Sequence, residues 1–491
     1  MALAAAVCAA ALVFWITRSP GPGLNPDAAS YMGAAESFAA GQGMRVPFAD
    51  WKAVKPTDRL AHFPPGFPIA IATTVSAGLQ APQGARLIEA ASAAATVGML
   101  AYVVAVDVGL AAAIALFAAI VFSRPLELVH LFVLSEPFFL FFVALTFVAM
   151  LRRWPALVLG CIAAAGTLVR FAGLALGVAA AVWQFMRPGS IRERLQRAVL
   201  AGAPTLIAYV AWALHARGGK HTTGIRKFGV YPGIGHTFTD GWRTIAQWLV
   251  PTSSVAPPPG WALLAALLIV IVLGALVWLA MRSFAISRLT DPRRSLAAVG
   301  VLTAAYLAVL IASRLLADPG IPFDYRILSP LVLLWATAVV IAVGSGFRQL
   351  PMAARGDIGA AFLVWCWTSS QVENDDIAWA TSNGSDFAGE QWRTSPLLAW
   401  AKSDGRNTPL FTNWPAAVYF HLHRDAWLLP NTTRRDTLAV FVDTLRARNG
   451  VILEFDVASP DAIQPADLAK VPGLHVVTKV SDGTVYGALP P

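Results

Sequence analysis

The stretch Leu134–Arg153, LSEPFFLFFVALTFVAMLRR, decides the class of this chain. An acid and a proline open it, a long apolar run follows, and two arginines close it. A membrane span needs roughly 20 predominantly apolar residues, and basic residues beside a span mark its cytoplasmic end. The stretch therefore predicts a transmembrane helix over 134–150 whose amino end lies on the exoplasmic side.

Similar runs recur through the first three quarters of the sequence. The 491 residues are 57% hydrophobic and 13% charged, whereas soluble proteins have roughly 25% charged residues. We expect a polytopic α-helical membrane protein with about eleven spans, the first of them uncleaved. They cover 1–17, 84–106, 109–123, 134–150, 155–170, 172–186, 197–214, 261–281, 296–313, 327–346 and 357–371. Residues 63–80 are short and fit an interfacial or re-entrant helix as well as a span.

Arginines in four short loops orient these spans. The loops contain Arg152 and Arg153; Arg187, Arg192, Arg194 and Arg197; Arg282, Arg288, Arg293 and Arg294; and Arg348 and Arg355. Two spans fit between each consecutive pair of loops, so all four loops can be cytoplasmic. The basic side chains of 18–62 favour the opposite orientation of the first span. The four loops outweigh them, because long loops cross the membrane largely regardless of charge.

This topology has a cytoplasmic N-terminus and an exoplasmic C-terminus. It makes 1–371 a membrane body, 18–83 a first exoplasmic loop with interfacial helices, and 372–491 a soluble exoplasmic domain. The net charge of +9 then fits anionic lipid headgroups and does not call for nucleic acid as a partner. A composition rich in alanine, with arginine favoured over lysine, points to a high-GC bacterium. We therefore expect these spans in a bacterial inner (cell) membrane.

The segment 372–491 has the pattern of a small α/β domain. Apolar β-forming runs predict strands over 408–412, 426–429 and 451–457, and a hairpin over 475–486. Helices are expected over 415–422 and 436–448 between these strands. We expect this domain to have a binding or structural role.

Ionisable residues at the predicted exoplasmic rim are the candidate site residues. Pro26 and Asp27 open a predicted amphipathic helix that includes Tyr31, and Asp27 is either its cap or a partly desolvated general base. Basic side chains precede a proline-rich entry to 63–80 and can contact a lipid phosphate; they are Lys55, Arg59 and His62.

Three further charged residues lie at the ends of predicted spans. Ser135 and Pro137 suit the start of a helix, but Glu136 is an ionisable group at membrane depth, where such groups are usually functional. Arg170 and Arg326 either extend harmlessly to the interface or bind phosphate through the planar guanidinium. Asp324 is an alternative partner for Arg326.

Several short motifs together resemble the GT-C glycosyltransferases, in particular the branch with protein O-mannosyltransferases and the lipid A aminoarabinose transferase. They are the first-loop acid followed by GQG at 41–43, HFPPGFP at 62–68, LSEP at 134–137, DYRILSP at 324–330, and FTNWPAAVYFHLHRDAWLLP at 411–430.

The resemblance implies transfer of a sugar from a polyprenyl-phosphate donor to an envelope lipid, polysaccharide or protein on the exoplasmic face, usually with inversion. Asp27 corresponds to the catalytic carboxylate and Glu136 to the acid at the start of a later span. Arg170 and Arg326 correspond to basic positions near the lipid phosphate. Ala28 stands where many relatives have a second acid, which bears on whether a divalent metal ion takes part.

Inverting transfer from a phosphate needs one base and a means of stabilising the charge that develops on the leaving group. Cationic side chains or a divalent ion can supply that stabilisation. Two other classes remain open: a flippase or transporter of lipid-linked sugars, and a non-catalytic envelope assembly protein. A transporter favours charges near the bilayer midplane and repeated halves, whereas the charges here gather at the rim.

Overall fold

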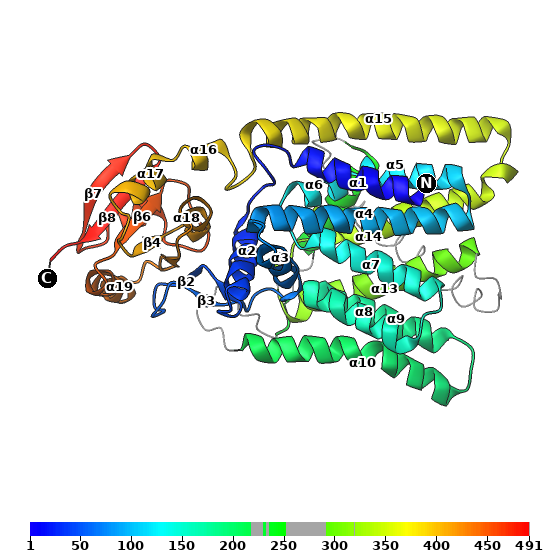
Figure 1. Ribbon diagram of the computed structural model, residues 1–491, viewed down its shortest axis with the longest axis horizontal. Helices are drawn as coiled ribbons and strands as arrows, with labels where there is room; N and C mark the ends of the chain where they lie inside the picture. Colours follow the sequence, from blue (N-terminus) through cyan, green and yellow to red (C-terminus); the bar gives the residue numbers. More distant parts are fainter. Residues whose placement is uncertain (218–228, 232–234, 252–290, 319, 491) are drawn as a thin grey trace. The chain divides into compact units, whose positions relative to one another are not determined.

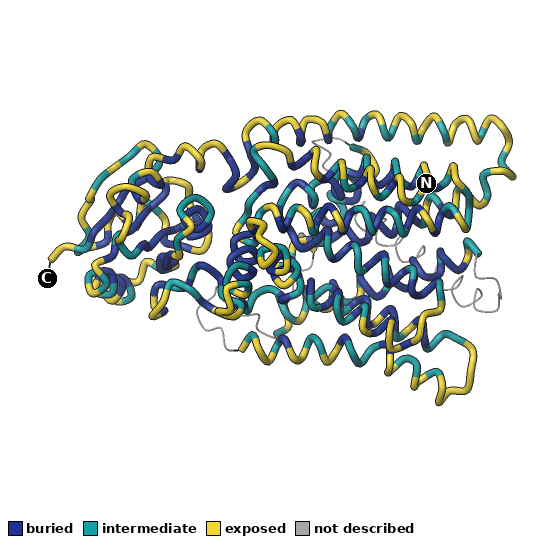
Figure 2. The backbone as a smooth tube through the Cα atoms, viewed as in Figure 1, coloured by how far each residue is buried: buried dark blue, intermediate teal, exposed yellow. Residues whose placement is uncertain are grey.

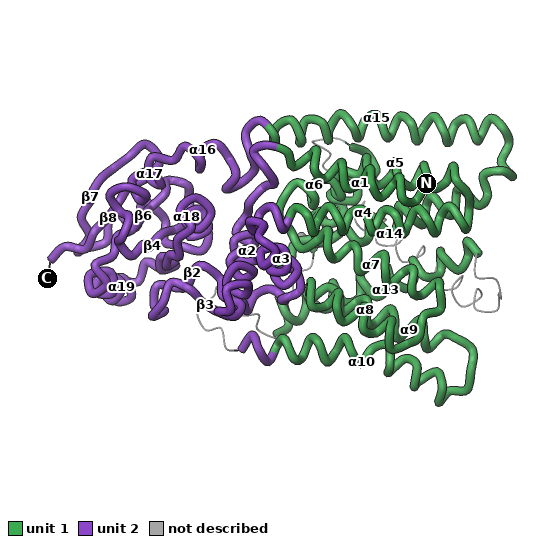
Figure 3. Tube along the Cα trace, in the orientation of Figure 1, with its two compact units in different colours: residues 1–18, 86–213, 226–381 green, residues 19–85, 214–225, 382–491 purple. Residues whose placement is uncertain are grey.

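The computed structural model describes residues 1–217, 229–231, 235–251, 291–318 and 320–490. The chain forms two compact units (Figure 3). Unit 1 comprises 1–18, 86–213 and 226–381, and unit 2 comprises 19–85, 214–225 and 382–491. The segment 19–85 therefore belongs to the same unit as the C-terminal residues.

Unit 1 is helical (Figure 1). Its described helices are α1 (Ala2–Ile16), α4 (Ala81–Asp107), α5 (Leu110–Val121), α6 (Arg124–Leu131), α7 (Glu136–Leu151), α8 (Ala156–Val169), η1 (Phe171–Gly173), α9 (Leu174–Met186), α10 (Ile191–Ala216), α11 (Gly235–Leu249), α13 (Pro292–Leu316), α14 (Tyr325–Gly346), η2 (Phe347–Gln349) and α15 (Met352–Asn383).

At least four of the described helices are long and apolar enough to cross a membrane: α4, α10, α13 and α14 with its η2 extension. The pair α5 and α6, bent by 57° at the break between them, makes a fifth if counted as one span. The chain is thus a membrane protein, as its composition predicts. The expected span over 261–281 lies outside the described residues. The total of about eleven membrane spans stays a prediction.

Small residues let the helices of unit 1 pack closely. A Cβ added to Gly160 in α8 would lie 2.7 Å from the backbone oxygen of Ala201 in α10, too close for any larger side chain. Buried residues gather along α4, α7, α13 and α14 (Figure 2), where they form one continuous apolar core.

The structure differs from the sequence prediction at two places in unit 1. The segment 124–133, which lies between two expected spans, contains α6, whose Leu126 and Val129 are buried. The boundary expected at 371/372 lies inside α15. That helix continues because its buried residues recur at helical spacing even after its mean hydropathy falls; they are Ser369, Glu373, Ile377 and Ala380.

Unit 2 contains a six-stranded mixed sheet in the order β2-β5-β4-β6-β8-β7. The strands are β2 (Phe48–Asp50), β4 (Leu410–Thr412), β5 (Ala426–Leu428), β6 (Val451–Phe455), β7 (Leu474–Val480) and β8 (Gly483–Ala488). The first four in the order are parallel, whereas β8 runs antiparallel to β6 and β7. A separate two-stranded sheet pairs β1 (Arg45–Val46) with β3 (Asp58–Arg59).

The helices of unit 2 are α2 (Pro26–Ala39), α3 (Gly66–Ser76), α16 (Glu390–Arg393), α17 (Pro396–Ser403), α18 (Pro415–Leu422), α19 (Arg435–Ala447) and α20 (Pro465–Leu468). The elements β4 to β8 lie where the C-terminal pattern predicts them, within a few residues. The joining of β2 to this sheet was not predicted. Phe48 pairs with Ala426 and Asp50 with Leu428, although some 380 residues separate them.

Helix α3 has 11 residues and is about 16 Å long, roughly half the thickness of a bilayer core. Helix α2 was expected to be amphipathic. It is not, because all its residues from Ala28 to Ala35 are buried. The small alanine, glycine and serine residues of α2 permit this close packing. At Gly33, any added Cβ would collide with the ring of Pro47.

Candidate functional site

The start of α2 determines where Asp27 lies. Asn25, and not Asp27, caps the helix: its Oδ1 accepts a hydrogen bond from the amide of Ala28 at 2.8 Å. The interpretation of Asp27 as a cap is therefore wrong. Pro26 occupies the first turn, where its missing N–H costs no hydrogen bond, and it sets Asp27 one position further into the helix.

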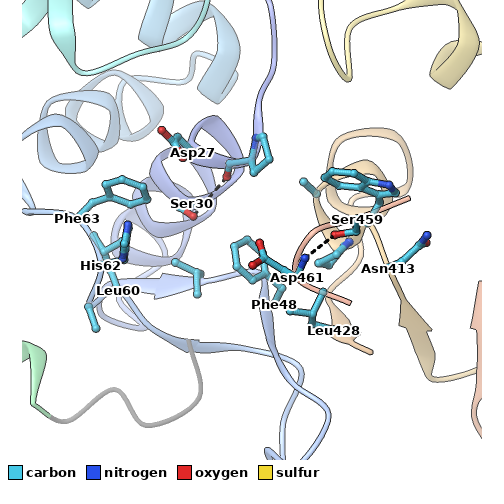
Figure 4. Close-up of a pocket in the computed structure, with 16 residues that line it drawn as sticks. Asp27, Ser30, Phe48, Leu60, His62, Phe63, Asn413, Leu428, Ser459 and Asp461 are labelled. Atoms are coloured by element: carbon cyan, nitrogen blue, oxygen red, sulfur yellow. Dashed lines mark hydrogen bonds between the residues drawn. The ribbon is translucent and has the colours of Figure 1, made fainter. Parts of the chain in front are cut away.

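Asp27 lines a cavity of about 350 Å³ within unit 2 (Figure 4). One side of the cavity comes from the first long loop, with Asp27 and Ser30 on α2 and His62 beyond β3. The other side comes from the C-terminal residues, including Asn413 and Asp461. Carboxylate, hydroxyl and imidazole groups thus face one space, which suits a polyhydroxylated ligand.

The C-terminal side of the cavity lies at the carboxyl edge of the parallel strands. Asn413 and Trp414 follow β4, Leu428 ends β5, and Ser459 follows β6. Loops at this edge are the usual ligand-binding position of parallel sheets.

Two side chains hold this edge in shape. The Asn413 carboxamide accepts from the amide of Phe455 at 3.0 Å and donates to its carbonyl at 2.8 Å. The Trp414 indole donates to the carbonyl of Val457 at 2.8 Å, which fixes the ring at the cavity wall. An indole face in this position can pack on a sugar ring. Trp392 and Trp427, in contrast, are buried in the core.

The remaining first-loop candidates lie in different surroundings. His62 lines the cavity and packs edge-on against Phe63, with ring centroids 4.6 Å apart. Tyr31 is buried between Phe63 and Phe67, at 4.8 and 5.3 Å, so its ring belongs to the packing behind the cavity. Lys55 and Arg59 are exposed and do not line the cavity.

The three charged residues at span ends come together in unit 1. Glu136 is 1% exposed, and its carboxylate contacts both arginines. Its Oε2 lies 2.6 Å from Arg170 Nη1 and its Oε1 lies 2.7 Å from Arg326 Nε. A buried carboxylate in this position orients two guanidinium groups, which lie at the end of α8 and the start of α14.

Neighbouring polar groups complete this cluster. Ser135 does not cap α7 through its side chain; its hydroxyl instead accepts from Arg170 Nη1 at 3.0 Å. Asp324 caps α14, because its Oδ1 accepts from the amides of Arg326 and Ile327 at 3.1 and 3.0 Å. Asp324 thus fixes the backbone that positions Arg326.

Some residues of these sites were not predicted from the sequence. Glu89 in α4 is fully buried, and its Oε1 accepts from the amide of Leu134, which leads into α7. An acid within an otherwise apolar run was the signal that could have identified it. Asn413 lies within the motif at 411–430 and Asp461 lies outside every motif, and the fold of unit 2 brings both to the cavity.

Among the described residues, no group of three or more His, Cys, Asp or Glu side chains could hold a metal ion. The segment between the expected spans 197–214 and 261–281 lies in part outside the described residues.

No protein-family model and no curated protein sequence matches the chain. Solved structures do match its fold. ArnT from Cupriavidus metallidurans bound to undecaprenyl phosphate has a TM-score of 0.52 at 15% identity, over 99% of this chain and 98% of that one. AglB, an archaeal oligosaccharyltransferase from Archaeoglobus fulgidus in complex with an inhibitory peptide and a dolichol-phosphate, has a TM-score of 0.52 at 12% identity, over 92% and 69%.

A third structure, the arabinofuranosyltransferase AftD from Mycobacteria, has a TM-score of 0.50 at 15% identity, over 100% of this chain and 41% of that one. All three are GT-C glycosyltransferases. At these identities the likeness concerns the fold. The chain therefore has the fold of the GT-C membrane glycosyltransferases, as the resemblance in its sequence predicted.

Proposed function

We propose that this chain transfers a sugar from a polyprenyl-phosphate donor to an envelope acceptor on the exoplasmic face of a bacterial inner membrane. Two matching structures contain a polyprenyl phosphate, undecaprenyl phosphate in ArnT and a dolichol-phosphate in AglB. The observation that carries the proposal is the cavity of unit 2, which Asp27 lines together with His62 and the Trp414 indole.

Asp27 acts as the general base in this proposal. Its carboxylate takes the proton from the acceptor hydroxyl as the acceptor oxygen attacks the anomeric carbon. The bond between that carbon and the phosphate oxygen breaks, and its electron pair leaves with the polyprenyl phosphate. Attack opposite the leaving group inverts the anomeric configuration, which requires only one carboxylate.

Arg170 and Arg326 bind the lipid phosphate in this proposal. Each guanidinium has five N–H donors in a planar fork that matches phosphate oxygens, and Glu136 contacts both of them. Glu136, expected from the resemblance to be catalytic, then acts by positioning the two arginines. Lys55 and Arg59 supply further positive charge for anionic headgroups, and His62 contacts the sugar or acceptor.

The topology deduced from the loop arginines forms part of the proposal. Unit 2 then faces the exoplasm, the N-terminus is cytoplasmic, and about eleven helices cross the membrane. The donor's lipid tail stays in the bilayer while its headgroup meets the acceptor at the membrane surface.

The test uses the full chain in nanodiscs with a panel of undecaprenyl-phosphate monosaccharides and an envelope lipid extract as the acceptor source. Release of undecaprenyl phosphate is the measurement. We expect Asp27→Asn to slow release at least about 10²-fold, the usual contribution of a general base. Asp443→Asn, at an exposed position on α19, is the matched control and should keep the wild-type rate.

Undiminished release by Asp27→Asn would remove the base assignment. Movement of the lipid-linked sugar across the nanodisc or vesicle membrane without release of undecaprenyl phosphate would indicate a transporter instead. Mass spectrometry of envelope glycans from a strain lacking the protein would then identify the acceptor.

A further inference from the structure

Unit 1 contains a second cavity, of about 290 Å³, among α1, α4, α5, α6 and α15. Its walls are mostly apolar and include Leu12, Val13, Val97, Ile120, Leu126 and Ile377. Its volume is near the lower end of ligand pockets, which start on the order of 300 Å³. The cavity can hold a small head group and a short length of apolar chain.

Two buried carboxylates face this apolar space. Glu127 from α6 is 8% exposed and Glu373 from α15 is 5% exposed, and both line the cavity. Three of their oxygens have no hydrogen-bond partner among the described residues. They are both carboxylate oxygens of Glu127 and Oε1 of Glu373. A buried carboxylate without a partner costs several kcal/mol, so such groups normally have a cation nearby.

Arg124 interacts electrostatically with both acids, but its hydrogen bonds go to a third carboxylate. Arg124 forms two hydrogen bonds with Asp376, Nε to Oδ2 at 2.6 Å and Nη2 to Oδ1 at 3.1 Å. This fork pairs its charge with Asp376. Glu127 and Glu373 therefore give the cavity a polar, acidic end.

His130 adds a further acceptor to that end. Its Nδ1 lies 2.6 Å from the carbonyl oxygen of Leu126, and a carbonyl only accepts, so Nδ1 carries the proton. In the neutral ring, Nε2 is then an acceptor. His130 lines the same cavity.

We propose that this cavity binds a primary ammonium group carried on an apolar chain, with the ammonium held by Glu127 and Glu373. The three N–H donors of an ammonium match the three carboxylate oxygens identified above, and its charge offsets the cost of burying them. The apolar walls take the chain. Acidic oxygens disfavour an anion, and a neutral ligand would not compensate the charge of the ionised carboxylates.

The proposal is tested with the full chain in detergent, with decylammonium as the probe and intrinsic tryptophan fluorescence as the readout of Tm. We expect decylammonium to raise Tm in a dose-dependent way, because a ligand stabilises the state that binds it. Decanol, which has the same ten-carbon alkyl group and no charge, should not raise Tm. Glu127→Gln and Glu373→Gln should each weaken binding at least about tenfold.

Glu193→Gln, at an exposed position on α10, is the matched control and should bind as the wild type does. An equal Tm increase with decanol, or undiminished binding by both glutamine variants, would overturn the proposal. A third outcome would also overturn the proposal. In it, Mg²⁺ or Zn²⁺ raises the Tm of the wild type but not of the glutamine variants, and decylammonium has no effect on Tm.

A photoreactive decylammonium gives a second measurement that needs no variant. Peptide mapping of the crosslinked wild type should find it on α6 and α15, and labelling elsewhere only would contradict the assignment. Nanodiscs with and without phosphatidylethanolamine then distinguish a membrane lipid from a free amine as the source of the ammonium. This binding does not depend on glycosyl transfer, so Asp27→Asn should leave it unchanged.

Discussion

The hydroxyl of Tyr419 donates a hydrogen bond to Oε2 of Glu36 at 2.6 Å, which joins α18 to α2. Burial raises the pKa of Tyr419, and the neighbouring Glu36 carboxylate raises it further, so the phenol stays protonated and keeps donating. The same α2 carries Asp27 at its other end. The bond therefore holds the helix of the proposed base against the C-terminal part of unit 2.

Removal of this hydroxyl should loosen α2. We expect Tyr419→Phe to lower the free energy of unfolding by about 1.5–3 kcal/mol, the range for a hydrogen bond to a charged group. The measurement is Tm by tryptophan fluorescence. Tyr102→Phe, which removes a hydroxyl from a half-exposed tyrosine in unit 1, is the control and should change Tm little. Equal effects of the two variants would mean that the Glu36 bond contributes nothing.

Glu136 and its two arginines should respond very differently to substitution. Glu136→Gln leaves two guanidinium groups beside a neutral amide in a buried site, which should lower the free energy of unfolding by about 3–5 kcal/mol. Arg170→Ala and Arg326→Ala should raise KM for the polyprenyl-phosphate donor more than KM for the acceptor. Steady-state kinetics with each substrate varied in turn makes the comparison.

Arg326→Lys serves as the conservative variant, because it keeps the charge and loses the planar fork. It should recover only part of the donor affinity. Unchanged donor kinetics in both alanine variants would remove these arginines from the proposed phosphate site.

Glu454 should make the stability of the protein depend on pH. The side chain is 2% exposed, and burial raises its pKa to about 8, with a further increase from Asp456. The folded state therefore keeps its proton up to about pH 8, whereas the unfolded chain releases it above roughly pH 4.5. The contribution of Glu454 to the free energy of unfolding is therefore fully present below about pH 4.5 and is lost as the pH rises toward about 8.

The difference between wild type and Glu454→Gln isolates this contribution. The variant should lose less stability than the wild type between pH 5 and pH 8, in Tm measurements at matched ionic strength. Glu390→Gln, at an exposed position on α16, should follow the wild-type curve. Parallel curves for all three proteins would show that Glu454 ionises normally in the folded state.

The proposed topology predicts the accessibility of single cysteines. Cys8, Cys161 and Cys366 form no disulfide, so they can be replaced by alanine to give a background without thiols. Lys402→Cys should then react with a membrane-impermeant maleimide in intact cells. Arg192→Cys, in a loop predicted to be cytoplasmic, should react only after lysis. The reverse pattern would invert the assigned orientation.

Local features of the sequence were sufficient to predict many elements. The helix Pro415–Leu422 begins and ends as expected, because a proline in its first turn and its apolar residues act within the helix itself. Interactions over a few residues also define the start of α7 at Glu136. The cap of α2 was missed because Asn25 and Asp27 are both good caps, and only the backbone geometry at Pro26 selects Asn25.

The sequence by itself determined the membrane class, the apolar helices, the strands β4 to β8 and the charged residues worth examining. Those features follow from hydropathy and periodicity, which depend on neighbours in the chain. Only the tertiary structure joined β2 to β5, brought Arg326 to Glu136 across 190 residues, and lined one cavity with Glu127 and Glu373. Such contacts depend on which surfaces pack together, and packing of distant segments leaves no periodic signal in a single sequence.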